Sequence, residues 1–404
     1  MAFRPRFTCS ALLLAVLCNA CGGGGGSGGS GGAPGPVTQA DLLQACPALA
    51  PPAAAVGSLG AAIDALVAAE MAARRIPAMT VTLARKGEIV YARAYGYADL
   101  ARCRPAVPGD AFQIGSVTKQ FTAAAILQLQ DAGQLDIDDK VQRYLPGYAV
   151  DPRLTLRMLL NQTSGLPDYA QFAAASGWVK GVPKAVVLDA IVKAPALFAP
   201  GTAYAYSNSN YFMLAAVIEA AGKTSYADYL SRHIFQPLEL QHTAYAPPPE
   251  AQTALPYTTT RPLVAGTQGL AAGIVPDPSL FFGASALWST GADLATWNAA
   301  LLGGAVVPPA LLATALTPPA AVPVFQNGAA TPYAMGWIRG SVDGHPLAWH
   351  NGKTYAYTAF NGILPDNGYS LSILANVDLQ EETPLLALAQ GMVQAICKAP
   401  GMAC

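Results

Sequence analysis

The chain contains 404 residues, of which 52% are hydrophobic and 12% charged, so it is long enough to bury a large core and too poor in charge for charge-driven disorder. The formal net charge is -1, from 23 Lys and Arg against 24 Asp and Glu. Because no basic run accompanies this balance, we expect no nucleic-acid partner.

The N-terminus carries processing signals. Two arginines precede an apolar stretch at 11–17, which is too short to span a bilayer but suits a signal peptide. We expect residues 1–20 to be this signal peptide and residues 21–36 to be a Gly/Ser-rich linker. The arrangement resembles a bacterial lipoprotein with Cys21 lipidated; plain cleavage is the alternative, because Cys18 stands where such signals usually carry Leu. Both predict export to the periplasm or cell envelope, with membrane contact only through a lipid anchor.

The cysteines agree with export. Without the signal peptide and the anchor Cys21, the chain keeps Cys46, Cys103, Cys397 and Cys404, an even number that suits an oxidising compartment. Four cysteines allow three pairings. Closeness in sequence favours Cys397 with Cys404, which leaves Cys46 with Cys103, and free buried thiols are the alternative.

Apolar patterning predicts strands near both ends of the chain and helices between them. The predicted elements, in chain order, are a helix at 59–75, strands at 79–85 and 88–94, helices at 121–131, 183–193, 209–221 and 292–302, strands at 357–364 and 369–375, and a helix at 384–398. Lys86-Gly87 is a turn signal between the first two strands, and a Pro-Asp-Asn-Gly tetrad separates the last two.

This order predicts one sheet assembled from both termini, with a mainly helical insertion beside it, and hence a mixed α/β (α+β) class. We assign one domain to 37–404. Its sheet subdomain would comprise about 55–115 and 300–404, its helical subdomain about 116–300, and the two would share a cleft.

Ser116 and Lys119 lie three residues apart where an extended stretch ends and an apolar helix begins. On a helix this spacing places both side chains on one face, so the amine can reach the hydroxyl. A serine is a poor nucleophile until a base takes its proton, and a desolvated lysine can be that base. Because the pattern is short, a surface lysine on an ordinary helix is the alternative.

Tyr206 and Asn208 stand in a polar loop that enters a helix. A phenol beside a lysine can carry protons as base and then acid, and an amide can both donate to and accept from a substrate. The alternative is a turn with Ser209 as helix N-cap, and both can hold at once.

His350, Asn351 and Gly352 precede the last two predicted strands, where an edge strand could line a cleft. A glycine there would let a substrate backbone approach closely, and an outward N–H could serve an oxyanion hole. A lone His before Gly is more often structural.

In this order the three motifs resemble those of the serine β-lactamase and penicillin-recognising D,D-peptidase superfamily, particularly its class C-like branch, which includes family VIII esterases. The resemblance runs from about Leu59 to Lys398. It includes further segments at Gly133–Asp139, Leu159–Leu166, Phe235–Leu238 and Ser289–Leu294. It implies a β-lactamase/transpeptidase-like fold, with an antiparallel sheet and flanking helices.

The resemblance also implies roles. Ser116 would be the acylated nucleophile, Lys119 its general base, and Tyr206 the group that assists proton transfer and deacylation. The backbone N–H groups of Ser116 and Lys353 would form the oxyanion hole, and Asn208 would hold the substrate amide.

The third element would bind substrate through His350, Asn351 and Gly352, which replace the Lys-Thr-Gly common in β-lactamases. Because His carries less charge than Lys, we expect weak β-lactamase activity. The predicted function is an exported serine hydrolase of the D-Ala-D-Ala carboxypeptidase or D-aminopeptidase type, or an esterase. Its substrate would be a small ester or an acyl-D-amino-acid, peptidoglycan-like molecule. A class C-like β-lactamase and a non-catalytic penicillin-recognising sensor are the alternatives.

No cofactor is needed for this chemistry, and no metal site is expected. The four histidines show no ligand spacing.

Overall fold

The computed structural model describes residues 46–47, 49, 57–175, 181–259, 270–319, 322–324, 332–379 and 385–399. The predicted signal peptide, the linker with its lipidation site Cys21, and Cys404 lie outside the described residues and stay predictions.

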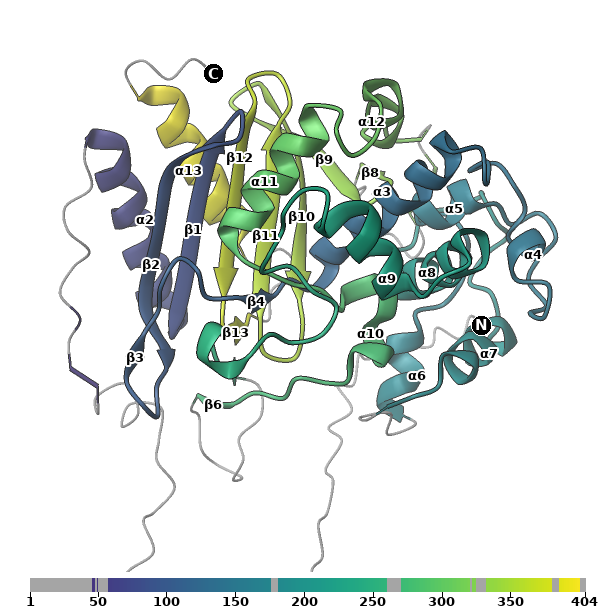
Figure 1. Ribbon diagram of the computed structural model, residues 1–404, viewed down its shortest axis with the longest axis horizontal. Helices are drawn as coiled ribbons and strands as arrows, with labels where there is room; N and C mark the ends of the chain where they lie inside the picture. Colours follow the sequence, from purple (N-terminus) through teal and green to yellow (C-terminus); the bar gives the residue numbers. More distant parts are fainter. Residues whose placement is uncertain are drawn as a thin grey trace, which may run out of the picture.

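One antiparallel sheet joins the two ends of the chain (Figure 1). Its strands are β1 (Ala78–Arg85), β2 (Glu88–Asp99), β3 (Arg104–Pro105), β8 (Tyr333–Ala334), β9 (Trp337–Val342), β10 (His345–Lys353), β11 (Thr358–Leu364) and β12 (Tyr369–Ala375). They lie in the order β3-β2-β1-β12-β11-β10-β9-β8. β1 and β12 meet in the middle, with Met79 opposite Ala375. The prediction of a sheet built from both termini, in a mixed α/β fold, is confirmed.

The local sequence explains the central strands. Lys86 and Gly87 have φ values of 49° and 88°, and positive φ at both central residues gives a hairpin turn whose twist matches the flanking strands. β1 and β12 are buried almost throughout. Both strands alternate apolar residues with Thr or Ser, at Met79–Leu83 and Tyr369–Ile373. The Thr and Ser side chains are buried as well, because both faces of the sheet are covered.

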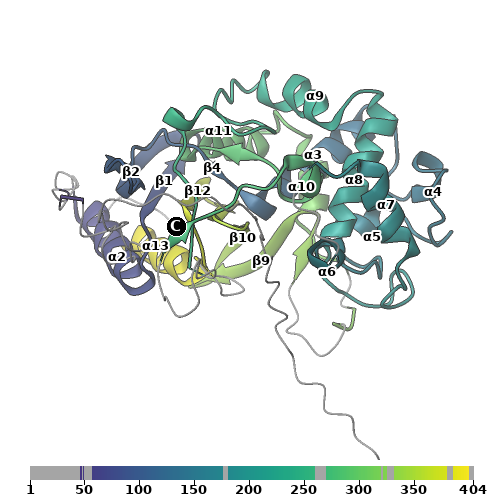
Figure 2. The ribbon, with the colours of Figure 1, turned by 90° about the horizontal axis from the view of Figure 1, so that it is seen from below.

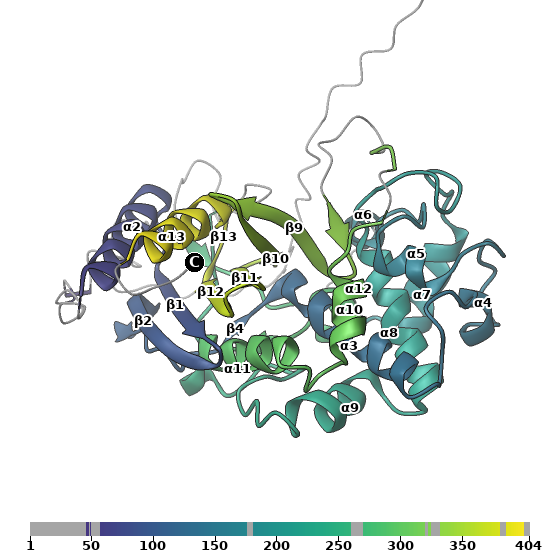
Figure 3. The ribbon, with the colours of Figure 1, turned by 90° about the horizontal axis from the view of Figure 1, so that it is seen from above.

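Helices cover both faces of the sheet. α2 (Ser58–Arg74) and α13 (Leu386–Lys398) pack together on one face, and α11 (Gly291–Leu302) packs on β1 and β12 from the other. Figures 2 and 3 show the sheet between these two helical layers. α11 therefore packs with the sheet layer, although it lies within the range predicted as helical up to about 300.

The remaining helices form a second body beside the sheet (Figure 1). They are α3 (Thr118–Asp131), α4 (Val141–Tyr144), α5 (Leu156–Leu160), α6 (Tyr169–Ala175), α7 (Lys184–Lys193), α8 (Asn208–Gly222), α9 (Tyr226–Leu230), α10 (Pro278–Ser285) and α12 (Pro309–Ala315). α8 is buried continuously from Ser209 to Ile218 and packs against α3, α5 and α10. A helix that is apolar on all sides belongs in a core. Within the described part of the chain, no helix is both long and apolar enough to cross a bilayer.

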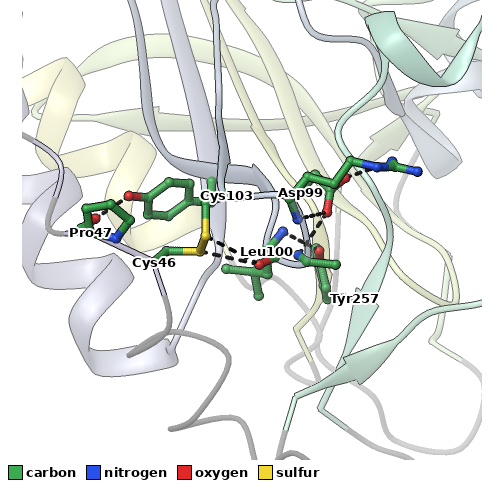
Figure 4. The surroundings of a disulfide bond; sticks show 9 residues. Cys46, Pro47, Asp99, Leu100, Cys103 and Tyr257 are labelled. Carbon is green, nitrogen blue, oxygen red and sulfur yellow. Dashed lines mark hydrogen bonds and ion pairs between the residues drawn. A yellow bond between two sulfur atoms is a disulfide. The ribbon is translucent and has the colours of Figure 1, made fainter.

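A disulfide joins Cys46 to Cys103, with Cα atoms 5.3 Å apart, as predicted (Figure 4). Cys103 lies in the turn between β2 and β3, and Cys46 precedes α2. The Leu100 N–H in the same turn donates to the Tyr257 hydroxyl at 2.7 Å. The bridge holds Cys46 beside the turn that follows β2. The other predicted bridge involves Cys404, outside the described residues.

Replacing both Cys46 and Cys103 with Ser should lower the free energy of unfolding by about 2 to 4 kcal/mol. The two cysteines are 57 residues apart in the sequence, so the bridge closes a long loop and restricts the unfolded chain. Urea unfolding of wild type and the double variant, both without reductant, measures the difference. Equal stabilities would show that this bridge does not constrain the unfolded chain.

Candidate active site

Ser116 lies at the junction between the sheet and the helical body. β4 (Phe112–Gln113) pairs with β7 (Trp288–Ser289), and the chain then enters a short 3-10 turn, Gly115–Val117, that runs directly into α3. This continuity explains why α3 begins at Thr118, earlier than predicted. Ser116 is partly exposed at the N-terminal end of the helix, where the backbone dipoles favour negative charge.

Two glycines allow close contact between β10 and the Ser116 turn. Gly115 has φ 53°, and a Cβ added there would lie 2.7 Å from Lys353 N. A Cβ added to Gly352 would overlap Ile114 O and lie 3.2 Å from Ser116 N. The backbone nitrogens of Ser116 and Lys353 therefore flank one narrow seam, where donors of the predicted oxyanion hole would have to lie.

Lys119 is fully buried one helical turn after Ser116. Its Nζ lies 2.9 Å from Ser116 Oγ, 2.8 Å from Asn208 Oδ1 and 2.9 Å from Ala284 O. Burial disfavours the ammonium form and lowers the pKa of Lys119 to about 7, although the negative charge of Asp168 acts in the opposite direction. A substantial neutral fraction is therefore available at neutral pH.

The three contacts determine where the neutral amine directs its lone pair. A neutral amine has two N–H donors and one lone pair, whereas Asn208 Oδ1 and Ala284 O can only accept. When these oxygens take both N–H groups, the lone pair is left for Ser116 Oγ. The site is thus arranged for Lys119 to accept the Ser116 proton.

The Ala284 carbonyl reaches Lys119 because α10 is kinked. Phe282 has φ 40° and ψ -132° inside this helix. For a residue other than glycine, this backbone conformation is unfavourable by about 1 to 3 kcal/mol. The kink turns the next two carbonyls toward α3, where Gly283 O accepts from the Thr122 hydroxyl and Ala284 O accepts from Lys119.

Tyr206 provides a second side-chain contact to the Ser116 hydroxyl. Its hydroxyl lies 2.9 Å from Ser116 Oγ, although 38% of the residue remains exposed. The pKa of Tyr206 lies well above its usual range. Desolvation of the hydroxyl is the larger cause, and the electrostatic effect of the neighbouring Tyr333 is the next. The phenol is therefore neutral in the resting site and donates a hydrogen bond to Ser116 Oγ.

The Tyr206 loop is held by α8 and by the segment Leu159–Leu166. Ser207, and not the predicted Ser209, caps α8, and its N–H donates to Gln162 Oε1 at 3.0 Å. The same loop therefore caps α8 through Ser207 and places the Tyr206 hydroxyl beside Ser116.

His350 is buried and hydrogen-bonded through both ring nitrogens, and its substrate-binding role stays a prediction. It is 2% exposed, Nδ1 lies 2.6 Å from Asn351 O, and Nε2 lies 3.1 Å from the Tyr333 hydroxyl. The carbonyl can only accept, so Nδ1 carries the hydrogen and Nε2 accepts from Tyr333. Burial, with a smaller effect of Lys119, lowers the pKa of His350 to about 3. The imidazole is neutral and contacts Tyr333, which packs on Tyr206.

The strand that carries this motif also differs from the prediction. β10 is an interior strand of the sheet, but its pairing with β9 ends at Trp349, while pairing with β11 continues to Lys353. Residues from His350 onward therefore form a local edge that faces the Ser116 turn. Because Gly352 has no side chain, the Ser116 turn can lie close to β10 at this point. The neighbouring Asn351 is half-buried.

Asp168 and Ala284 were missed by the sequence analysis. Asn208, predicted to hold a substrate amide, uses its amide to bridge Lys119 and Asp168, donating from Nδ2 to Asp168 Oδ2 at 2.9 Å. Asp168 follows the segment Leu159–Leu166 by two residues, a signal that could have found it. A backbone carbonyl such as Ala284 O has no sequence signal.

Comparisons with known proteins identify the family of the chain. The Beta-lactamase family model matches residues 63–390, and the chain belongs to this family. It is similar to Penicillin-binding protein 4* of Bacillus subtilis (strain 168), with 38% identity over 168 residues, 41% of this chain and 37% of that protein. The chain thus aligns with less than two thirds of the length of the curated relatives that it first matches.

Two solved structures share the fold over most of the chain. A D-stereospecific amidohydrolase from Streptomyces sp. has a TM-score of 0.67 and 25% identity, covering 84% of this chain and 98% of that one. A D-amino acid amidase from Ochrobactrum anthropi SV3, complexed with L-phenylalanine, has a TM-score of 0.72 and 23% identity, with the same coverage. The chain therefore has the architecture of this superfamily, as the resemblance implied.

Replacing Gly352 with Ala should push the Ser116 turn away from β10, because the new Cβ would overlap Ile114 O. We expect acylation of Ser116 to slow by about 100-fold or more, as when one oxyanion donor is lost. Labelling by a fluorophosphonate, followed by mass spectrometry, measures the rate. Gly109→Ala is the matched control, since a Cβ there meets nothing within 4 Å. Equal labelling rates in the two variants would contradict a role for this seam.

Proposed function

We propose that the protein is an exported serine hydrolase that cleaves D-amino-acid amides, short D-amino-acid peptides or related esters through an acyl-enzyme on Ser116. The observation that carries the proposal is the pair of contacts on one oxygen. Lys119 Nζ and the Tyr206 hydroxyl both lie 2.9 Å from Ser116 Oγ. Acyl transfer requires a base that removes the proton of the attacking hydroxyl and an acid that protonates the leaving group, both close to that hydroxyl.

Acylation follows from these contacts. Ser116 Oγ bonds to the substrate carbonyl carbon while its proton passes to Lys119 Nζ. The carbonyl oxygen becomes an oxyanion beside the N–H groups of Ser116 and Lys353, and each such donor stabilises it by about 3 kcal/mol. When the bond to the leaving nitrogen or oxygen breaks, Tyr206 supplies the proton and regains one from Lys119.

Deacylation reverses the proton path. Lys119, neutral again, takes a proton from water by way of Tyr206, and the resulting hydroxide bonds to the acyl carbon. Collapse of this second intermediate breaks the bond to Ser116 Oγ, which recovers its proton from Lys119. Because Tyr206 is neutral at rest, it acts first as a donor.

One observation favours uncharged amides and esters over β-lactams, and a second favours a D-configured substrate. The imidazole at His350 is neutral and buried, so this position supplies no positive charge for a substrate carboxylate. The D-stereospecific amidohydrolase is similar over 84% of this chain, which supports a D-configured acyl group.

Export rests on the N-terminal sequence. The apolar stretch, Cys21 and the Gly/Ser linker support a lipid-anchored protein of the periplasm or cell envelope, and the Cys46–Cys103 bridge suits an oxidising compartment.

The test measures the rate of hydrolysis of five separate substrates: D-alanine amide, L-alanine amide, a p-nitrophenyl ester, a D-Ala-D-Ala peptide and nitrocefin. We expect faster hydrolysis of the D amide than of the L amide, and slow nitrocefin turnover. Ser116→Ala should lower kcat/KM at least ~10⁴-fold, because the residual binding groups cannot replace a nucleophile.

Ser279→Ala is the matched serine control, since its side chain forms no hydrogen bond among the described residues. Equal rates on the two enantiomers would contradict the substrate class. Wild-type activity in Ser116→Ala, or no Ser116 adduct with a fluorophosphonate, would contradict the acyl-enzyme itself.

A further inference from the structure

The Asp168 carboxylate lies at the outer end of a chain of contacts that leads to Ser116. Its Oδ2 accepts from Asn208 Nδ2 at 2.9 Å, and its Oδ1 accepts from the Ala170 N–H at 3.0 Å. The neighbouring backbone is tied to α8, because the Ser209 hydroxyl donates to Pro167 O at 2.6 Å and accepts from the Tyr169 N–H at 2.9 Å. The half-buried carboxylate is thus held from both sides.

This contact determines the direction of the Asn208 amide. An ionised carboxylate can only accept, so Asn208 must turn its NH₂ group toward Asp168 and its oxygen toward Lys119. In the opposite orientation the NH₂ group would point at Lys119 Nζ and compete with the Ser116 hydroxyl for the lone pair. Among the described residues, the hydrogen bonds of the Asn208 side chain go to Lys119 and Asp168. A neutral Lys119 can either donate or accept, so the acceptor-only carboxylate of Asp168 selects the orientation.

We propose that Asp168 is a positioning residue that acts through Asn208 to keep the lone pair of neutral Lys119 directed at Ser116 Oγ. Asp168 does not touch the nucleophile. It fixes one of the two acceptors that occupy the N–H groups of the amine, and the Ala284 carbonyl is the other. The inference rests on the proposed function, because it assigns Lys119 the role of base.

The charge of Asp168 has a second, opposite effect on the same amine. Lys119 is faced by the rings of Tyr206 and Tyr211, whose centroids lie 4.9 Å and 5.6 Å from Nζ, and by the neutral His350 on β10. Among these groups Asp168 carries the negative charge, and it raises the pKa of Lys119 against the larger effect of burial. Loss of the charge should therefore lower this pKa while also releasing Asn208.

The experiment measures the rate at which a fluorophosphonate labels Ser116 across a pH series, in wild type and Asp168→Asn. In wild type the rate should rise with pH through the pKa of Lys119, about 7. In Asp168→Asn the rise should move to lower pH, because the ammonium form has lost a stabilising charge. The rate at high pH should fall about 100-fold, because the amide at 208 can turn round.

Asp168→Glu keeps the charge and an acceptor-only group. In this variant the labelling rate should rise over the same pH range as in wild type. At high pH the rate should lie between those of Asp168→Asn and wild type. Asp189→Asn removes one negative charge from an exposed ion pair on α7 and should leave the profile unchanged. Circular dichroism and thermal melts of each variant show whether it folds as wild type.

A slower plateau without the acid shift would indicate a structural role and overturn the inference, as would a wild-type profile in Asp168→Asn. The same acid shift in Asp168→Glu would also overturn it. These outcomes leave the acyl-enzyme intact. Absence of labelling in wild type at every pH would instead overturn the proposed function, and this inference with it.

Discussion

The buried amine of Lys119 is the interaction on which the rest of the site depends. An ammonium ion without solvent is costly, so burial shifts the lysine toward its neutral form. A neutral amine is useful only if its lone pair points at the nucleophile. The acceptors Asn208 Oδ1 and Ala284 O provide this direction by occupying the N–H groups. The kink at Phe282 and the capped start of α8 are the backbone features that place them.

The active groups come from different layers of the fold. Ser116 and Lys119 belong to the start of α3, Tyr206 to the loop before α8, and Lys353 to the sheet. Their relative placement requires the sheet and the helical body to approach closely. Gly115 and Gly352 permit this approach, since side chains at either position would separate β10 from the Ser116 turn. The local edge of β10 beyond its pairing with β9 provides the room.

Much of this arrangement could be predicted from the sequence, where the information is local. Helical periodicity located α3, α8 and α13 to within a few residues, and Lys86-Gly87 located the β1–β2 hairpin. The contacts that control Lys119 could not be predicted, because Ala284 O is a backbone atom 165 residues away. The burial of His350 likewise depends on Tyr333, which the sheet brings beside it.

The decisive measurement is the protonation state of Lys119 in the resting protein. Nuclear magnetic resonance of protein made with isotope-labelled lysine, with Lys119→Ala to assign the signal, follows the amine through a pH titration. We expect a transition near pH 7, far below that of an ordinary lysine. An ammonium signal that persists to the usual lysine pKa would contradict it, because Ser116 would then face a cation instead of a base.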